Sequence, residues 1–172
     1  GNFINMWDSI DSNKKLGSLI ANDSDGVVAG NPKMGFRPPM TGAGYNYIQP
    51  PIFNPGSNDF TAQFNLFKKE GIEVLTGLAV PPDFATFWTQ AAQQGLTKQL
   101  KAATFAKALL FPPAIEALGD RGIGLTSEVW WSPSHPFKSG LTGMSAKQVT
   151  DEYTSTTGKQ WTQPLGFKHA NI

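Results

Sequence analysis

The chain has 172 residues, a length that suits one domain with a substantial buried core. Hydrophobic residues make up 40% and charged residues 16%, which indicates a globular chain rather than a disordered one. The net charge of +1, from 14 basic and 13 acidic residues, gives no electrostatic signature of nucleic-acid or anionic-membrane binding. The absence of cysteine excludes disulfides and thiolate chemistry.

Hydrophobic patterning in the first half predicts two strands and two helical stretches. Residues 16–21 form the first predicted strand, and a turn at residues 22–26 follows it. The stretch to residue 41 is expected to be partly helical, with Pro32, Pro38 and Pro39 limiting its length. Residues 45–48 form the second strand. A helix over residues 60–70 follows, with N-cap candidates at residues 57–59 and a stop at Gly71.

The second half continues the alternation. Strands are predicted at residues 72–77, 100–105 and 126–131. A helix begins at Pro82 or at Asp83, the candidate N-cap, and ends at Gly95. A further helix over residues 108–118 is interrupted near its start by Pro112 and Pro113, and a polar helix over residues 145–157 follows a Pro- and Ser-rich crossover at residues 132–136.

Strands that alternate with helices predict an α/β fold, a Rossmann-like parallel sheet sandwiched by helices. Ligands of such sheets bind at the carboxyl ends of the strands. The sequence therefore places the functional edge in the loops that follow residues 21, 77, 105 and 131.

Motifs of catalysis and cofactor binding are missing from the sequence. There is no G-x-G-x-x-G, no P-loop and no G-x-S-x-G elbow. The two histidines, His135 in the crossover and His169 near the end, lack the partners that a general base or a metal site needs. We therefore expect no enzymatic activity, no cofactor and no metal site.

Four segments in their order and spacing carry a family resemblance: KLGSLIANDSDG at residues 15–26, NDFTAQ at 58–63, EVLTG at 73–77 with PPD at 81–83 and QAAQQG at 90–95, and WWSPSHPF at 130–137. Over nearly its whole length the chain resembles the type I periplasmic solute-binding proteins of ABC transporters, the branched-chain amino acid receptor group. The resemblance implies a periplasmic receptor that traps a solute between two lobes and docks on an ABC permease.

The resemblance also implies a domain organisation. Residues 1–133 correspond to the second α/β ligand-binding lobe, and residues 134–172 to the crossover and the truncated return into the other lobe. That return segment would expose apolar side chains such as Trp161, Leu165 and Phe167, and exposed apolar surface tends to be covered by a partner. We expect a homodimer or a domain swap of the isolated chain.

Amino-acid receptors of this group contribute from this lobe an aromatic residue after the first strand, another after the third, and an acidic residue after the fourth. These positions map here to Gly26 and Val27, beside Asp25, to Val80 and Pro81, and to Lys107, beside Ala106. All three depart from the amino-acid pattern, so the ligand is expected to differ from an ordinary α-amino acid.

Lys107 is the most informative departure. A cation repels an ammonium group and favours a carboxylate, with which a charge-assisted hydrogen bond contributes roughly 1.5–3 kcal/mol. The helix expected after Lys107 would add a favourable dipole for an anion. The alternative is a solvated lysine at a helix start.

Two tryptophans end the fifth predicted strand. Strand alternation puts Trp130 and Trp131 on opposite faces, so that one lies in the core and the other forms an apolar wall suited to an aromatic acid. Asp23 and Asp25 either accept ligand hydroxyls or form the turn.

The function expected from these features is solute binding without bond chemistry, by closure of two lobes. A ligand-sensing receptor domain is the first alternative, because the same two-lobed fold serves in receptors and regulators. A small α/β enzyme is the second, and it would need convergent titratable groups in the cleft.

Overall fold

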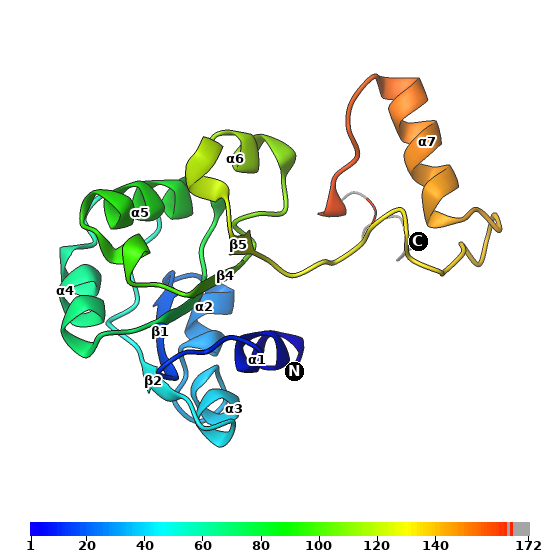
Figure 1. Ribbon diagram of the computed structural model, residues 1–172. Helices are drawn as coiled ribbons and strands as arrows, with labels where there is room; N and C mark the ends of the chain where they lie inside the picture. Colours follow the sequence, from blue (N-terminus) through cyan, green and yellow to red (C-terminus); the bar gives the residue numbers. More distant parts are fainter. Residues whose placement is uncertain (165, 167–172) are drawn as a thin grey trace. The chain divides into compact units, whose positions relative to one another are not determined.

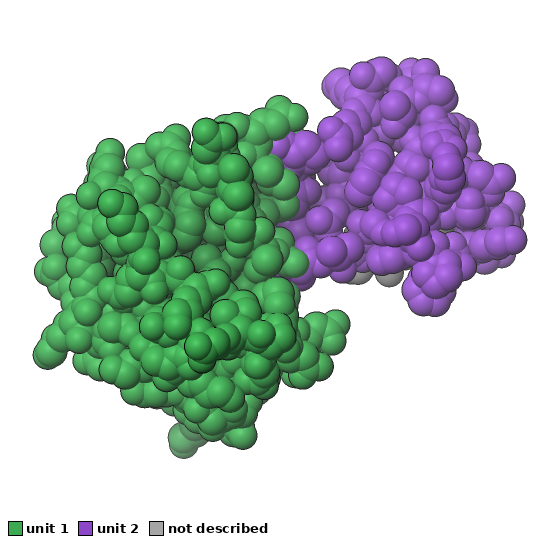
Figure 2. Space-filling view, viewed as in Figure 1, with its two compact units in different colours: residues 1–109, 113–127 green, residues 110–112, 128–172 purple. Residues whose placement is uncertain are grey.

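The computed structural model describes residues 1–164 and 166. The chain divides into two compact units, which Figure 2 colours separately. Residues 1–109 and 113–127 form the first unit, and residues 110–112 with the described residues from 128 onward form the second. The division after residue 127 lies six positions before the boundary expected from the sequence. Leu165 and residues 167–172, where part of the exposed apolar surface was expected, lie outside the described residues.

The first unit contains a five-stranded parallel sheet with the order β2-β1-β3-β4-β5 (Figure 1). The predicted α/β class with a parallel sheet is confirmed. The strands are β1 (Lys15–Ile20), β2 (Asn46–Ile48), β3 (Val74–Leu78), β4 (Ala102–Ala106) and β5 (Leu125–Thr126). Four of them match the predicted positions to within about two residues, because buried apolar runs bounded by turn residues are a strong strand signal.

Helices cover both faces of this sheet. On one face lie α4 (Thr61–Glu70) and α5 (Pro81–Gln93) (Figure 1). Their phenylalanines pack with Leu19, Leu75 and Phe105. Trp7 of α1 (Asn2–Asp8) and Met40 of α3 (Arg37–Gly42) pack on the other face. The sandwich predicted from the sequence is therefore confirmed, and α1 is an element that the patterning did not predict.

The central helices follow from the sequence pattern. Phe60, Phe64 and Phe67 recur at helical spacing and are buried, and Gly71 ends α4 in the left-handed conformation at φ 66°. α5 begins at Pro81, whose ring suits the first turn of a helix. Val80 is the N-cap of α5, so the expectation that Asp83 caps this helix is wrong.

The remaining helices of the first unit are short. They are α2 (Ser24–Ala29), α6 (Pro112–Glu116, which begins at the unit boundary), and the 3-10 helices η1 (Leu96–Lys98) and η2 (Gly119–Gly122). The bounds of the helix predicted over residues 108–118 are wrong. Residues 107–109 form a turn, and α6 begins only at Pro112 because proline is tolerated at a helix start and not inside it.

The fifth predicted strand is also corrected. β5 covers only Leu125 and Thr126, which pair with Ala103 and Thr104, and no residue from 127 to 131 belongs to a strand. The run 126–131 reads as a strand because it is rich in β-branched and aromatic residues. Local composition carries no information on where the chain leaves its neighbour β4, which continues to Ala106 beyond the last pair.

The second unit contains α7 (Ala146–Thr157). A capping box begins this helix: the Ser145 hydroxyl accepts from the Gln148 backbone N–H, and the Gln148 side chain accepts from the Ser145 N–H. Gly158 ends it in the left-handed conformation. The predicted helix over residues 145–157 is confirmed. No helix among the described residues is long and apolar enough to cross a membrane.

Candidate functional site

Three strands of the first unit end level with one another. Ile20 of β1 pairs with Leu78 of β3, and Leu78 pairs in turn with Ala106 of β4. Because all strands run parallel, the loops that follow these three residues meet at the same edge of the sheet. This edge carries six of the eight site residues expected from the sequence: Asp25, Gly26, Val80, Pro81, Ala106 and Lys107.

A lysine and two carboxylates come together at this edge. The amine of Lys107 forms an ion pair with Asp25 and lies 3.5 Å from Oδ2 of Asp23. Burial lowers the pKa of the Lys107 amine, but the hydrogen bond to Asp25 and the charges of both aspartates outweigh burial and hold the pKa above its ordinary value. Lys107 is therefore a permanent cation at this edge.

The backbone of Lys107 adopts the left-handed region, at φ 67°. This region is uncommon for residues other than glycine. A turn, and not a helix, follows Lys107, so the expected contribution of a helix dipole to anion binding is wrong. Any attraction of an anion must come from the amine itself.

Gly26 allows α2 to approach the end of β1. A Cβ atom at residue 26 would lie 1.8 Å from the carbonyl oxygen of Ala21, so no other residue fits without movement of the backbone. The side chain of Asp23 caps α2 by accepting the Gly26 N–H at 2.7 Å. This turn places Asp23 and Asp25 within reach of Lys107.

The β3–α5 loop contributes apolar surface. Val80 is exposed, Pro81 is partly buried, and neither side chain can donate or accept a hydrogen bond. Just beyond them, the buried carboxylate of Asp83 accepts the Gly56 N–H at 2.9 Å and so ties the loop after β2 to the start of α5. Oδ2 of Asp83 is buried and has no hydrogen-bond partner among the residues that the structure describes.

A groove of about 450 Å³ adjoins Gly26, and the sequence did not predict it. Its lining residues are Gly26, Val27, Gly30, Asn31, Gln49, Pro50, Pro51 and Ile52. The Gln49 amide donates to the Gly30 carbonyl at 3.1 Å and so joins α2 to the segment after β2. The available signal was the dipeptide Pro50–Pro51, separated by one residue from the second predicted strand, because it prevents that strand from continuing past the carboxyl edge.

The two remaining expected residues lie in the second unit. Trp131 is buried and packs edge-to-face on Trp161, with ring centroids 5.6 Å apart. Trp130 is 40% exposed, and its indole donates to Glu128 at 3.0 Å. One tryptophan is thus buried and the other partly exposed, although no strand alternation produces the difference.

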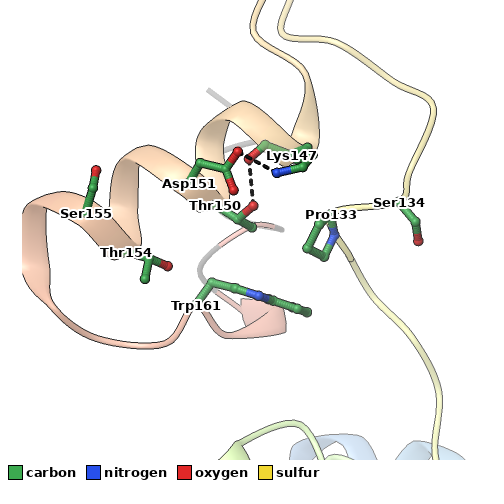
Figure 3. Close-up of a pocket in the computed structure, with 8 residues that line it drawn as sticks. All are labelled: Pro133, Ser134, Lys147, Thr150, Asp151, Thr154, Ser155 and Trp161. Atoms are coloured by element: carbon green, nitrogen blue, oxygen red, sulfur yellow. Dashed lines mark hydrogen bonds and ion pairs between the residues drawn. The ribbon is translucent and has the colours of Figure 1, made fainter.

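A second groove, of about 670 Å³, lies in the second unit (Figure 3). It is lined by Pro133, Ser134, Lys147, Thr150, Asp151, Thr154, Ser155 and Trp161. The Lys147 amine is paired with Asp151 at 2.7 Å, and the Thr150 hydroxyl donates to the Lys147 carbonyl. These three residues are thus paired with one another within the second unit. Among the residues that the structure describes, no three His, Asp or Glu side chains converge as metal ligands.

Comparison with solved structures shows the fold. The chain is similar to a leucine-binding protein from Thermotoga maritima, with a TM-score of 0.69 and 20% identity over 91% of this chain and 42% of that one. It is similar to a periplasmic ligand-binding protein of a branched-chain amino acid ABC transporter from Burkholderia xenovorans LB400, with a TM-score of 0.71 and 14% identity over 98% and 42% of the two chains.

A third similar structure is an ABC transporter solute-binding protein from Rhodopseudomonas palustris BisB5 in complex with 3,4-dihydroxybenzoic acid. Its TM-score is 0.64, with 17% identity over 98% of this chain and 45% of that one. The chain thus spans less than half the length of each of these three proteins. The comparison with curated proteins gives no match.

Structural similarity at such low sequence identity shows the fold alone, whereas a family model assigns the chain to a family. The model described as periplasmic binding protein matches residues 18–171, which is most of the chain and includes every strand except the start of β1. The chain belongs to the periplasmic binding protein family.

Proposed function

We propose that the chain supplies one lobe of the solute-binding component of an ABC importer in the periplasm. In this proposal residues 1–133 form the ligand-binding lobe, and residues 134–172 form the crossover and the return into the other lobe. The solute is a small organic carboxylate, with aromatic acids the first candidates. Binding involves lobe closure and no bond chemistry, and the closed form docks on a membrane permease.

One observation carries the choice of ligand: a partly buried lysine amine at the carboxyl edge of the parallel sheet. Lys107 sits directly after β4, level with the ends of β1 and β3, where sheets of this kind receive their ligands. A carboxylate placed against the Lys107 amine gains a charge-assisted hydrogen bond. Gly26, Val80, Pro81 and Ala106 offer backbone and apolar surface to the rest of the ligand.

A thermal-shift and NMR titration of the chain tests the proposal. The probes are benzoate and 3,4-dihydroxybenzoate, with leucine as the zwitterionic comparison. A ligand at about 100 times its Kd stabilises a protein by roughly 2.7 kcal/mol, and NMR also detects weaker binding. We expect the carboxylates to shift the amide resonances of residues 23–26 and 106–108.

Lys107→Gln should abolish these shifts. Lys101→Gln is the matched control, because Lys101 precedes β4 at its opposite end and also forms an ion pair, with Glu73 at 3.3 Å. Shifts produced by leucine alone would contradict the carboxylate assignment and leave a solute-binding lobe. Shifts that survive Lys107→Gln would remove Lys107 from the site.

A further inference from the structure

The two carboxylates beside Lys107 differ in how firmly they are held. Asp23 accepts the Gly26 N–H with Oδ1 at 2.7 Å while Oδ2 lies 3.5 Å from the Lys107 amine. Its side chain is 28% exposed. Movement of this carboxylate would break the cap of α2, so Asp23 is a fixed neighbour of the lysine.

Asp25 has no such anchor. Its Oδ2 is the closer of the two to the Lys107 amine, and its side chain is 61% exposed. Within the described part of the chain, the ion pair with Lys107 is the one interaction of this carboxylate. A change of rotamer would release Asp25 into water at the cost of that pair alone, and exposed ion pairs contribute little free energy.

Lys107 is held more firmly than Asp25. Its side chain is 23% exposed, and its backbone sits in a turn at the end of a central strand. When Asp25 moves away, the Lys107 amine stays beside Asp23 at the carboxyl edge. The hydrogen bond that Asp25 accepted from this amine then becomes available to a ligand. An external carboxylate has the same charge and the same acceptor geometry as the group that it would replace.

Building on the proposed function, we infer that Asp25 is an internal competitor for the ligand site. In the ligand-free chain the Asp25 carboxylate is ion-paired with the Lys107 amine. The carboxylate of the solute displaces the Asp25 carboxylate from this amine. Asp25 thereby determines specificity, because a solute without a carboxylate gains nothing from opening the ion pair. The apparent affinity is reduced to the fraction of molecules in which the pair is open.

The test compares benzoate binding to the chain and to Asp25→Asn by NMR titration. An ion pair of this exposure is closed in most molecules and open in some, so Asp25→Asn should lower the apparent Kd for benzoate about fivefold. Asp11→Asn is the matched control, because it removes the same charge from an exposed aspartate of the same unit and should leave the Kd unchanged.

Each outcome bears on the inference. An unchanged or higher Kd for benzoate in Asp25→Asn, with Lys107→Gln still abolishing binding, overturns the competitor role and leaves the proposed function intact. Leucine binding that weakens in Asp25→Asn would make Asp25 a direct ligand of the ammonium group and overturn the inference too. Absence of any response to benzoate at Lys107 in both proteins overturns the inference together with the proposed function.

A second readout does not depend on a ligand. The titration of the Lys107 amine, followed by NMR, should move to lower pH in Asp25→Asn because a neighbouring negative charge is lost. A titration that stays in place would show that Asp25 does not occupy the amine, whatever the benzoate titrations give.

Discussion

The indole nitrogen of Trp7 donates a hydrogen bond to the hydroxyl of Thr104, 97 residues away in the sequence, at 3.0 Å. Both residues are fully buried. The Thr104 hydroxyl also shares a hydrogen bond of 2.7 Å with the hydroxyl of the half-buried Thr126, so three side chains form a continuous row. The row joins α1 to β4 and β5, the strands next to the proposed site.

Trp7→Phe should therefore destabilise the first unit. The variant leaves a cavity and removes the donor to a buried hydroxyl, which together cost about 2–4 kcal/mol. Urea denaturation measures the loss. Trp130→Phe is the control, because Trp130 is 40% exposed and lies in the second unit. Equal losses in the two variants would contradict the special role of the Trp7 hydrogen bond.

The buried phenol of Tyr45 gives a pH dependence at high pH. Its hydroxyl donates to Oδ1 of Asp8 at 3.0 Å, and burial together with this hydrogen bond raises the pKa of Tyr45 to about 12. Because folding raises its pKa, the Tyr45 hydroxyl makes its full contribution to the free energy of unfolding below pH 10. This contribution is lost as the pH rises towards 12. Denaturation midpoints across this range should fall more steeply for the chain than for Tyr45→Phe.

The partner Asp8 gives the opposite dependence at low pH. Hydrogen bonds from Lys14 and then from Tyr45 lower the pKa of Asp8. A pKa lowered by folding contributes stability that is present above pH 3.8 and is lost as the pH falls through the folded value. Asp8→Asn should flatten the acid limb of the stability curve, and an acid limb of unchanged slope would contradict the assignment.

Gly77 should tolerate no side chain. A Cβ atom at this position of β3 would lie 2.0 Å from the carbonyl oxygen of Leu19 and 2.9 Å from the ring of Phe105. Gly77→Ala must therefore move a central strand, at a cost of about 3 kcal/mol. Gly42→Ala is the control, because open space surrounds that residue in α3 and alanine favours a helix by up to about 1 kcal/mol.

Part of the fold and of the candidate site could be predicted from the sequence. β1, β3 and β4 are buried apolar runs bounded by turns, so the sheet and its functional edge follow from local pattern. The contacts of Trp7 and of Lys107 join segments about a hundred or about eighty residues apart, and no local pattern encodes them. The resemblance supplied the position of Lys107, but it could not show that Asp25 already pairs with it.

Both misplaced elements are shorter than predicted. β5 is two residues long and α6 five, because tertiary pairing limits the first and proline limits the second. Residues 108–118 contain good helix formers, yet Pro112 permits a helix only from its own position onward. Element boundaries near prolines are consequently the part of this fold that pattern alone predicts worst.

The capping box of α7 should set the local stability of that helix. Ser145→Ala removes the acceptor for the Gln148 N–H and should cost about 1 kcal/mol. Amide hydrogen exchange in the first turn of α7 should accelerate about fivefold. Ser155→Ala, an exposed position near the end of the same helix, should leave that first turn unchanged. Equal acceleration in both variants would contradict the cap.

The isolated chain is predicted to associate through the apolar side chains of its second unit. Phe137 is 74% and Leu141 78% exposed, and apolar groups this exposed are commonly covered by a partner. Light scattering after size exclusion should give the mass of a homodimer. A Phe137→Ser/Leu141→Ser double variant should be a monomer, whereas Ile123→Ser, at a comparably exposed residue of the first unit, should still dimerise.

The double variant distinguishes two forms of dimer, association through exposed side chains and a domain swap. Association through exposed side chains is reversible and weakens with dilution, and the double variant removes it. A domain swap exchanges whole elements and buries contacts that the monomer already makes, so it would persist in the double variant and exchange slowly. A monomer at every concentration would contradict both forms, since the exposed Phe137 and Leu141 would then need no partner.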